Sequence, residues 1–267
     1  MLLAVDIGNT SIKSGLLLGS ALRVRARLPS RRELTAAEAR DFWLQWLEAE
    51  SVRRADVVAA IVCSVVPSLT PVIVEGLRLA LGVEAQIVGP STDTGITIVG
   101  PNPLELGSDR LVNAAAAWSQ LQARGLPAQE LPGQLVVDLG TATKLDALSP
   151  RGEFLGGVIA PGLETSLEGL VARAARLRTV PLQVPERVLG RSTLTCVQSG
   201  VMHGHASLID GLVARLRREL PFPLEVLATG GYAALIAPHT DSLRKIEPDL
   251  TLIGLSAIHA RTSVARA

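Results

Sequence analysis

The first part of the chain contains three apolar stretches separated by residues that favour turns. Residues 2–8 and 11–19 are mostly apolar, whereas 21–28 alternates between apolar residues and arginines. An apolar residue at every second position is typical of a strand with one buried face, and glycine-containing turns lie between the stretches. The pattern predicts a β-meander over residues 2–28.

Helix and strand patterns alternate after this meander. Thr35 and Glu38 have the spacing of a capping box, and apolar residues recur at helical intervals over 35–50. Residues 57–66 form an uninterrupted apolar run, as expected for a strand that is buried on both faces. A second helix follows and ends near Gly82. This alternation of strands and helices predicts an α/β fold.

The motif at the start of the first meander recurs in the second half of the chain. AVDIGNTSIK and VVDLGTATKL share Val, Asp and Gly in register, and their aspartates, Asp6 and Asp138, lie about half of the chain apart. We therefore expect two similar lobes, each a mixed β-sheet with flanking helices. The expected lobes span residues 1–112 and 113–267, with the active site in the cleft between them.

Composition disfavours two classes of partner. The chain has 26 Lys and Arg against 25 Asp and Glu, and its formal net charge is +1. It lacks the positive field that attracts nucleic acid or an anionic membrane, and we expect neither as a partner. Only 3% of the residues are aromatic, which disfavours stacking on bases.

The sequence also predicts a cytoplasmic protein. No basic segment precedes the first apolar stretch as in a signal peptide, and no apolar run reaches about 18 residues, the length that spans a membrane. The two cysteines, Cys63 and Cys196, lie far apart in apolar or helical contexts, as expected for reduced thiols. Neither has a neighbour in the sequence that would activate it for catalysis.

The first turn, DIGNT, has the residue types of a phosphate-binding hairpin. Gly8 allows close backbone approach, Asn9 and Thr10 supply hydrogen-bond donors, and Asp6 can hold a hydrated Mg²⁺ ion. An ordinary hairpin turn that contains asparagine has the same composition. This turn alone does not decide between the two interpretations.

The second turn, DLGTAT, favours phosphate binding. Asp138 offers a second metal ligand, Thr141 a hydroxyl group and Gly140 exposed backbone. A late glycine pair, Gly230 and Gly231, follows an apolar strand and precedes a helix. The three elements in this order resemble the superfamily of acetate and sugar kinases, heat-shock chaperones and actin. In that superfamily the two turns hold phosphates and the glycine pair lies beside adenosine.

The stretch GPNPLELGSDR contains the most specific combination of residues. Ser108 can cap the following helix, which places Asp109 and Arg110 in its first turn, where free backbone N–H groups favour anions. Asp109 is then suited to accept a proton, and Arg110 to bind a carboxylate. The alternative is structural, an acidic residue that stabilises a helix start beside a solvated arginine.

Together these motifs resemble the type III pantothenate kinases. The elements DIGNT, ELGSDR, DLGTAT, GGVIAPG and TGG occur in that family's order and spacing, over nearly the whole chain. The resemblance implies that a homodimer phosphorylates pantothenate with ATP at the start of coenzyme A synthesis. It also implies that the ATP phosphates lie on residues 6–13 and Thr141, with Mg²⁺ neutralising their charge.

The resemblance further implies roles for individual residues. Asp109 accepts the proton from the primary hydroxyl of pantothenate, and Asp138 is a ligand of the monovalent cation, K⁺ or NH₄⁺, that these kinases require. The implied substrate-binding residues are Gly107, Ser108, Arg110 and Thr193. The implied ATP-binding residues are Asp6, Gly8, Asn9, Thr10, Lys13, Thr141, Gly230 and Gly231.

Two positions depart from the family pattern. Gly100 stands where the family usually has a tyrosine that contacts pantothenate, so it is a candidate substrate-binding position without the usual side chain. Lys144 stands where the family has threonine. Either its ammonium group reaches the phosphates or takes the place of the monovalent cation, or strand alternation points it to solvent.

Two other functions stay open on the sequence alone. The missing tyrosine at position 100 would permit a kinase that acts on another small hydroxyl acid. A nucleotide-binding regulator without turnover could have the same fold. The retention of Asp6, Asp109, Arg110 and Asp138 argues against such a loss of catalysis.

Overall fold

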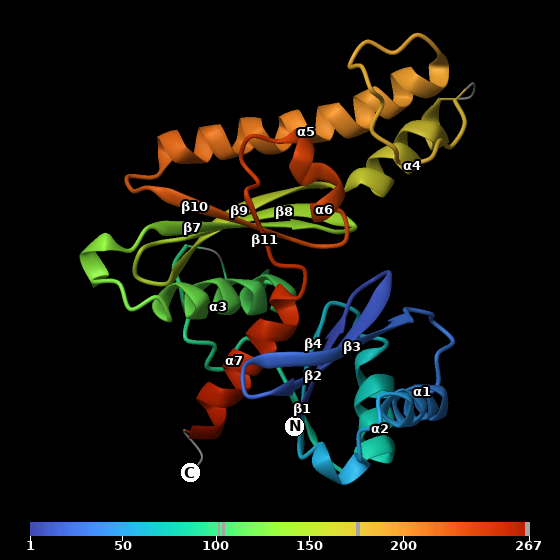
Figure 1. Cartoon of the computed structure of the whole chain (residues 1–267), viewed down its shortest axis with the longest axis vertical. Helices are drawn as coiled ribbons and strands as arrows, with labels where there is room; N and C mark the ends of the chain where they lie inside the picture. The colour runs from blue at the N-terminus through green and yellow to red at the C-terminus, as the bar shows by residue number, and fades with distance from the viewer. Residues whose placement is uncertain (101, 103–104, 175–176, 265–267) are drawn as a thin grey trace. The chain divides into compact units, whose positions relative to one another are not determined.

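Figure 1 shows the computed structural model, in which strands and helices alternate as the sequence predicts. The structure describes residues 1–100, 102, 105–174 and 177–264. Within these residues no helix combines the length and the apolar character needed to cross a membrane. Short elements besides those named below are 3₁₀ helices at Arg54–Asp56, Ala128–Glu130 and Ala237–His239, and the strand β6 at Thr97–Ile98.

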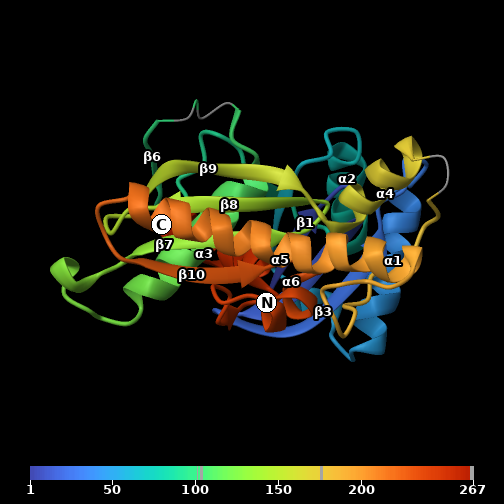
Figure 2. The ribbon, with the colours of Figure 1, turned by 90° about the horizontal axis from the view of Figure 1, so that it is seen from above.

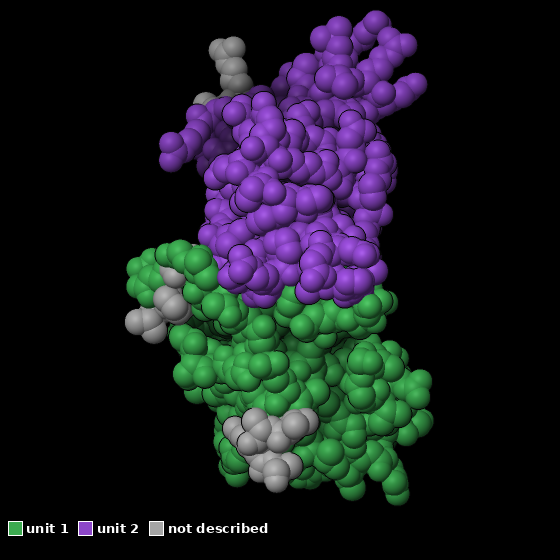
Figure 3. All heavy atoms as spheres, turned by 90° about the vertical axis from the view of Figure 1, so that its left-hand side faces the viewer, with its two compact units in different colours: residues 1–125, 249–267 green, residues 126–248 purple. Residues whose placement is uncertain are grey.

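The chain divides into two compact units, which Figure 3 shows in different colours. Unit 1 contains residues 1–125 and 249–267, and unit 2 contains residues 126–248. The boundary that the sequence predicts between the two lobes, at residue 112, lies inside a helix of unit 1. The predicted second lobe also includes the last helix, which belongs to unit 1 instead. Unit 1 is thus built from two distant parts of the chain.

The sheet of unit 1 has the strand order β3-β2-β1-β4-β5. Its strands are β1 (Leu2–Ile7), β2 (Ser11–Leu18), β3 (Ala21–Pro29), β4 (Ala59–Ser64) and β5 (Ala85–Ile87). The first three form the predicted antiparallel meander, and β4 and β5 extend the sheet in parallel with β1.

Helices cover both faces of this sheet. Helices α1 (Ala36–Ala49) and α2 (Thr70–Leu81) pack on one face, and α3 (Ser108–Gln122) and α7 (Leu250–Val264) pack on the other. All six residues of β1 are buried as a result. The predicted capping box at the start of α1 is present, since the side chains of Thr35 and Glu38 bond to each other's backbone amides.

Unit 2 repeats this topology. Its strands lie in the order β9-β8-β7-β10-β11, which corresponds to β3-β2-β1-β4-β5 of unit 1, with an antiparallel meander followed by two parallel strands. The strands are β7 (Gly133–Leu139), β8 (Ala142–Leu148), β9 (Glu153–Pro161), β10 (Leu224–Thr229) and β11 (Lys245–Ile246). The helices are α4 (Leu163–Arg173), α5 (Thr193–Glu219) and α6 (Ala233–Ile236). The predicted pair of similar mixed sheets with flanking helices is therefore confirmed.

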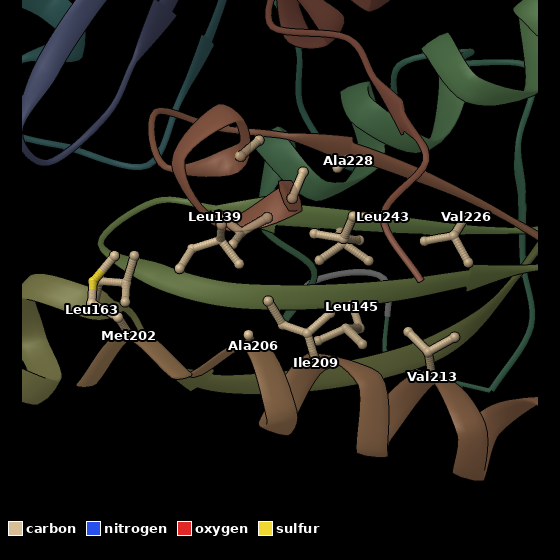
Figure 4. Packing of buried hydrophobic residues seen from close by; sticks show 14 of the residues in the cluster. Leu139, Leu145, Leu163, Met202, Ala206, Ile209, Val213, Val226, Ala228 and Leu243 are labelled. Carbon is tan, nitrogen blue, oxygen red and sulfur yellow. The ribbon is translucent and has the colours of Figure 1, made fainter. Parts of the chain in front are cut away.

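The core of unit 2 lies largely between its sheet and α5, which runs along the sheet in Figures 1 and 2. Figure 4 shows Ile209 and Val213 of α5 facing Leu145 of β8. Burial of one such large aliphatic side chain contributes about 1.5–3 kcal/mol. This packing holds the sheet that contains the DLGTAT turn, which the sequence predicts to bind phosphate.

Candidate functional site

The first hairpin turn is held by hydrogen bonds to the chain around it. The Gly8 amide donates to the Ser11 carbonyl at 3.1 Å. The hydroxyl and the amide of Ser30 donate to the carbonyls of Gly8 and Thr10 at 2.6 and 3.2 Å. Asn9 and Thr10 are exposed. The turn thus combines an ordered backbone with two exposed polar residues at the end of β1, an arrangement suited to a phosphate.

Asp6 lies at the end of β1 on the face of the sheet that carries α3. Leu2 and Ala4 pack with residues of α3 and α7, and alternation along the strand points Asp6 the same way. Its carboxylate is largely buried, accepts a hydrogen bond from the Cys63 thiol at 3.4 Å, and lies 3.9 Å from the Lys13 ammonium nitrogen. These two partners are the residues opposite Asp6 on β4 and β2.

Cys63 is a residue of this site that the sequence did not identify. The side chain is fully buried, and burial raises the pKa of its thiol well above the ordinary value of 9.0, with the charges of Asp6 and Asp109 adding to the effect. The thiol is therefore protonated and donates a hydrogen bond rather than acting as a nucleophile. Since both carboxylates act on one thiol, the structure brings Asp6 and Asp109 into one neighbourhood of unit 1.

The start of α3 differs from the prediction in one respect. The sequence predicts Ser108 as the cap, but the helix begins at Ser108, and Gly107 is the capping residue without a side-chain hydrogen bond. The Ser108 hydroxyl instead donates to the Ser64 carbonyl at 2.9 Å and accepts from the Ser64 amide at 3.2 Å. These bonds fasten the first turn of α3 to the end of β4.

Asp109 and Arg110 lie in the first turn of α3, as predicted. One carboxylate oxygen of Asp109 accepts a 2.8 Å hydrogen bond from the Arg110 amide. Gly107 packs closely against the same oxygen, because a Cβ at position 107 would lie 2.7 Å from it. The backbone N–H groups at the start of a helix favour negatively charged groups, so this turn suits both a carboxylate and an anionic ligand.

The second hairpin contains a close ion pair. Asp138 on β7 lies directly opposite Lys144 on β8, and the Lys144 ammonium nitrogen is 2.8 Å from Asp138 Oδ2. The two side chains are only 17% and 16% exposed, respectively. The alternative in which Lys144 points to solvent is therefore wrong.

The turn of the second hairpin is fixed by the start of α4. The Gly140 amide donates to the Ala142 carbonyl at 3.1 Å. The Thr141 carbonyl accepts from the Gly162 amide at 3.0 Å and from the Thr165 hydroxyl at 2.8 Å. Thr141 itself is exposed. This residue thus lies on a fixed backbone next to a helix N-terminus, a position that favours anions.

Gly230 packs against the end of β7. Its φ is 94°, and a Cβ there would lie 2.5 Å from the Leu139 carbonyl oxygen and 2.6 Å from Asp138 Oδ1. The Tyr232 amide also donates to the Leu139 carbonyl at 3.1 Å. Gly231, in contrast, has open space where a Cβ would be. The glycine pair and the second hairpin therefore form one group within unit 2.

Among the pockets lined by the described residues of unit 2 are two of a size suited to small molecules. The larger of the two, about 1050 Å³, is lined by residues of α4, of α5 and of the segment between them, and includes Thr193, a predicted substrate-binding residue. His205 also lines it, is hydrogen-bonded to Thr143 at 2.8 Å, and has the pKa of its imidazole lowered by burial. The smaller pocket, about 400 Å³, is lined in part by Tyr232, which follows the glycine pair.

Gly100 lies in unit 1 on an exposed stretch and has a φ of 104°. Residues with a Cβ are strained at such an angle, whereas glycine adopts it readily. The backbone at this position therefore suits glycine better than the tyrosine of the family pattern.

Comparison with known proteins finds relatives over the whole chain. Residues 2–215 match the family model described as type III pantothenate kinase. The type III pantothenate kinase of Moorella thermoacetica is 38% identical over 263 residues, which cover 98% of this chain and 100% of the relative. Type III pantothenate kinase 1 of Symbiobacterium thermophilum is 41% identical, with 97% and 96% covered.

Solved structures share the fold at low sequence identity. Component A of (R)-2-hydroxyglutaryl-CoA dehydratase from Acidaminococcus fermentans has a TM-score of 0.55 at 12% identity, covering 99% of this chain and 98% of that one. The ethanolamine utilization protein EutJ from Carboxydothermus hydrogenoformans has a TM-score of 0.53 at 14% identity, covering 96% and 89%. These similarities support the actin-like ATPase fold, which the resemblance of the two turns and the glycine pair implies.

Proposed function

The chain belongs to the type III pantothenate kinase family, and from this premise we propose how its residues carry out the reaction. The enzyme transfers a phosphoryl group from ATP to pantothenate, giving 4′-phosphopantothenate in the first step of coenzyme A biosynthesis. Full-length similarity to the family favours pantothenate over another small hydroxyl acid, and catalysis over a regulator without turnover.

In this proposal the hairpin turns bind the ATP phosphates, through residues 6–13, which include Lys13, and through Thr141. The hydrogen-bonded backbone of the first turn supports its role, as does the position of Thr141 beside the start of α4. Gly230 and Gly231 lie beside the adenosine. The pocket of about 400 Å³ supports this placement, because Tyr232, the residue after the glycine pair, lines it.

A Mg²⁺ ion accompanies ATP, with Asp6 as its contact in the protein. Mg²⁺ retains several waters and usually takes only one or two carboxylates besides phosphate oxygens. Asp6 fits this requirement because its carboxylate lies directly before the first turn. Within the described residues, no three His, Cys, Asp or Glu side chains gather into a metal site that would serve instead. When bound, the ion neutralises charge on the phosphates.

Asp109 is the catalytic base of the proposal. It accepts the proton from the primary hydroxyl of pantothenate while the hydroxyl oxygen bonds to the γ-phosphorus and the bond to the ADP oxygen breaks. The observation that carries this role is the position of Asp109 in the first turn of α3, which two bonds between Ser108 and Ser64 hold in place. Arg110, the next residue, binds the carboxylate of pantothenate.

The remaining substrate-binding positions are Gly100, Gly107, Ser108 and Thr193. Gly107 and Ser108 form the start of α3, directly before the proposed base. The position of Thr193 on the larger pocket supports its role. Gly100 contributes backbone only.

We further propose that the enzyme acts in the cytoplasm, where ATP is available.

We also propose that it is a homodimer. Large exposed apolar residues on neighbouring segments of unit 2 support self-association, because such groups mark interaction surfaces. They are Leu170, Val188, Leu189 and Leu194. Sedimentation velocity tests this point, and a species of monomer mass at micromolar concentration contradicts it.

Asp109→Asn tests the assignment of the base. The amide oxygen of asparagine can still accept the hydrogen bond from the Arg110 amide, so the fold is retained while the proton acceptor is lost. Pantothenate-dependent ADP release should fall about 10²–10⁴-fold, the usual contribution of a positioned base, with an unchanged Tm. Asp41→Asn makes the same change at an exposed site on α1 and should retain activity. Retained activity of Asp109→Asn would assign the base to another residue.

A further inference from the structure

The second hairpin contains a positive charge that is held in a fixed position. The Lys144 ammonium nitrogen lies 2.8 Å from Asp138 Oδ2, and the two side chains are 16% and 17% exposed. Water and salt screen such a pair less than they screen an exposed one. The short charge-assisted contact therefore keeps the ammonium group at the hairpin rather than in solvent.

The other side of Asp138 is closed by the chain itself. A Cβ at Gly230 would lie 2.6 Å from Asp138 Oδ1, so glycine backbone packs against that oxygen. Thr229, which is buried, is the residue opposite Asp138 on β10. One carboxylate oxygen of Asp138 is thus engaged by Lys144, and the other lies against the backbone of Gly230.

This arrangement does not fit the monovalent cation that the family resemblance implies at Asp138. A K⁺ or NH₄⁺ ion bound to this carboxylate would lie next to the Lys144 ammonium group, where two positive charges repel each other at short range. Threonine, the family's usual residue at position 144, carries no charge and leaves room for an ion. Lysine places a compact positive charge there instead.

The strand register places a lysine opposite the aspartate in both hairpins. In the aligned motifs Lys13 and Lys144 are one position apart. The second turn is one residue shorter, however, so Lys144 lies opposite Asp138 just as Lys13 lies opposite Asp6. The pair in the first hairpin is looser, with 3.9 Å between the charged atoms and a lysine that is 33% exposed. Lys144 is therefore the more firmly held of the two ammonium groups.

We propose that the Lys144 ammonium group replaces the monovalent cation, so that phosphoryl transfer by this chain needs neither K⁺ nor NH₄⁺. The proposal rests on the assignment of the second hairpin to phosphate binding in the proposed function. Phosphoryl transfer depends largely on positioning and on neutralising the charge of the phosphates. A tethered ammonium group supplies one positive charge at this hairpin whatever the ion concentration.

Turnover of the wild-type enzyme in different salts gives the first test. Pantothenate-dependent ADP release is measured with MgATP in tetramethylammonium, K⁺ and NH₄⁺ salts at equal ionic strength. We expect rates that agree within about threefold, because the required charge is part of the protein. A larger rise with K⁺ or NH₄⁺ overturns the proposal.

Variants at position 144 give the second test. Lys144→Thr should lose about tenfold or more of its activity in tetramethylammonium and recover it in K⁺ or NH₄⁺, whereas Lys144→Arg should stay independent of the cation. Lys245→Thr makes the same change at an exposed lysine of β11 and should behave as wild type. Lys144→Thr with wild-type rates in all three salts overturns the proposal.

Thermal melting gives a readout that does not depend on activity. K⁺ should raise the Tm of Lys144→Thr relative to tetramethylammonium, but not that of the wild type, because only the variant has a place for the ion. Equal stabilisation of both proteins by K⁺ overturns the proposal. If the wild type phosphorylates pantothenate in none of the salts, the proposed function has failed. The Tm values of the wild type and of Lys144→Thr in K⁺ and tetramethylammonium still decide whether Lys144 occupies the place of the ion.

Discussion

Replacement of Gly230 by alanine should disrupt the group formed by the second hairpin and the glycine pair. The new Cβ would lie 2.5 Å from the Leu139 carbonyl oxygen and 2.6 Å from Asp138 Oδ1. Favourable contacts between such atoms require about 3.5 Å, so the methyl group is about 1 Å too close. The Leu139 carbonyl cannot move away easily, because it also accepts the Tyr232 amide at 3.1 Å.

Two free-energy costs, backbone strain and overpacking, set how far Gly230→Ala destabilises the protein. A residue with a Cβ is strained at the φ of 94° found here, and such strain costs about 1–3 kcal/mol. Forcing a methyl group into a packed site costs about another 1–3 kcal/mol. The free energy of unfolding should therefore fall by about 2–6 kcal/mol, and the Tm by at least about 4 °C.

Melting curves of Gly230→Ala and Gly231→Ala, followed by circular dichroism, measure this effect. Gly231 is the matched control, because it is the adjacent residue and has open space where its Cβ would be. Alanine there should leave the Tm unchanged or raise it slightly, since it restricts the unfolded chain. Equal Tm values for the two variants would refute the argument from close packing.

Two further predictions concern groups with shifted pKa values. Burial lowers the pKa of His205 below 6.5, so the unfolded state binds more protons and the free energy of unfolding falls as the pH decreases below that value. Urea unfolding at neutral and acidic pH should show a smaller fall for His205→Asn, and an equal fall would contradict this. Burial also keeps Cys63 protonated, whereas Cys196 is exposed. Iodoacetamide should modify Cys196 first in the native protein, with Cys63 reacting only on unfolding; mass spectrometry that finds equal rates would contradict this.

Sequence patterns predicted the features that depend on neighbouring residues. The meanders follow from period-two alternation and glycine turns, and the repeat follows from two similar motifs. The position of Asp109 in the first turn of α3 follows from local helix signals. The sequence also raises the possibility that the Lys144 ammonium group takes the cation's place beside Asp138, but it leaves the alternative that Lys144 points to solvent open.

The features that the sequence leaves open or does not show depend on strand register and on how separate segments meet. The pairing of Asp138 with Lys144 follows from the length of the turn, and Cys63 joins Asp6 only through the register of two parallel strands. The Ser108 hydroxyl can bond either to the backbone amides of its own helix or to the end of β4. It bonds to β4 because Ser64 lies within reach. Local propensity does not contain this information.

Unit 1 is built from two separated segments of the chain, and this affects the order in which its parts can fold during synthesis. Leu252, Leu255 and Ile258 of α7 complete the core on the face of the unit 1 sheet that also carries α3. Residues 126–248 emerge before α7 and form a continuous unit, so this unit can fold while the face awaiting α7 is still uncovered. The neighbourhood of Asp109 therefore reaches its final form only after residues 126–248 have left the ribosome and α7 has followed them.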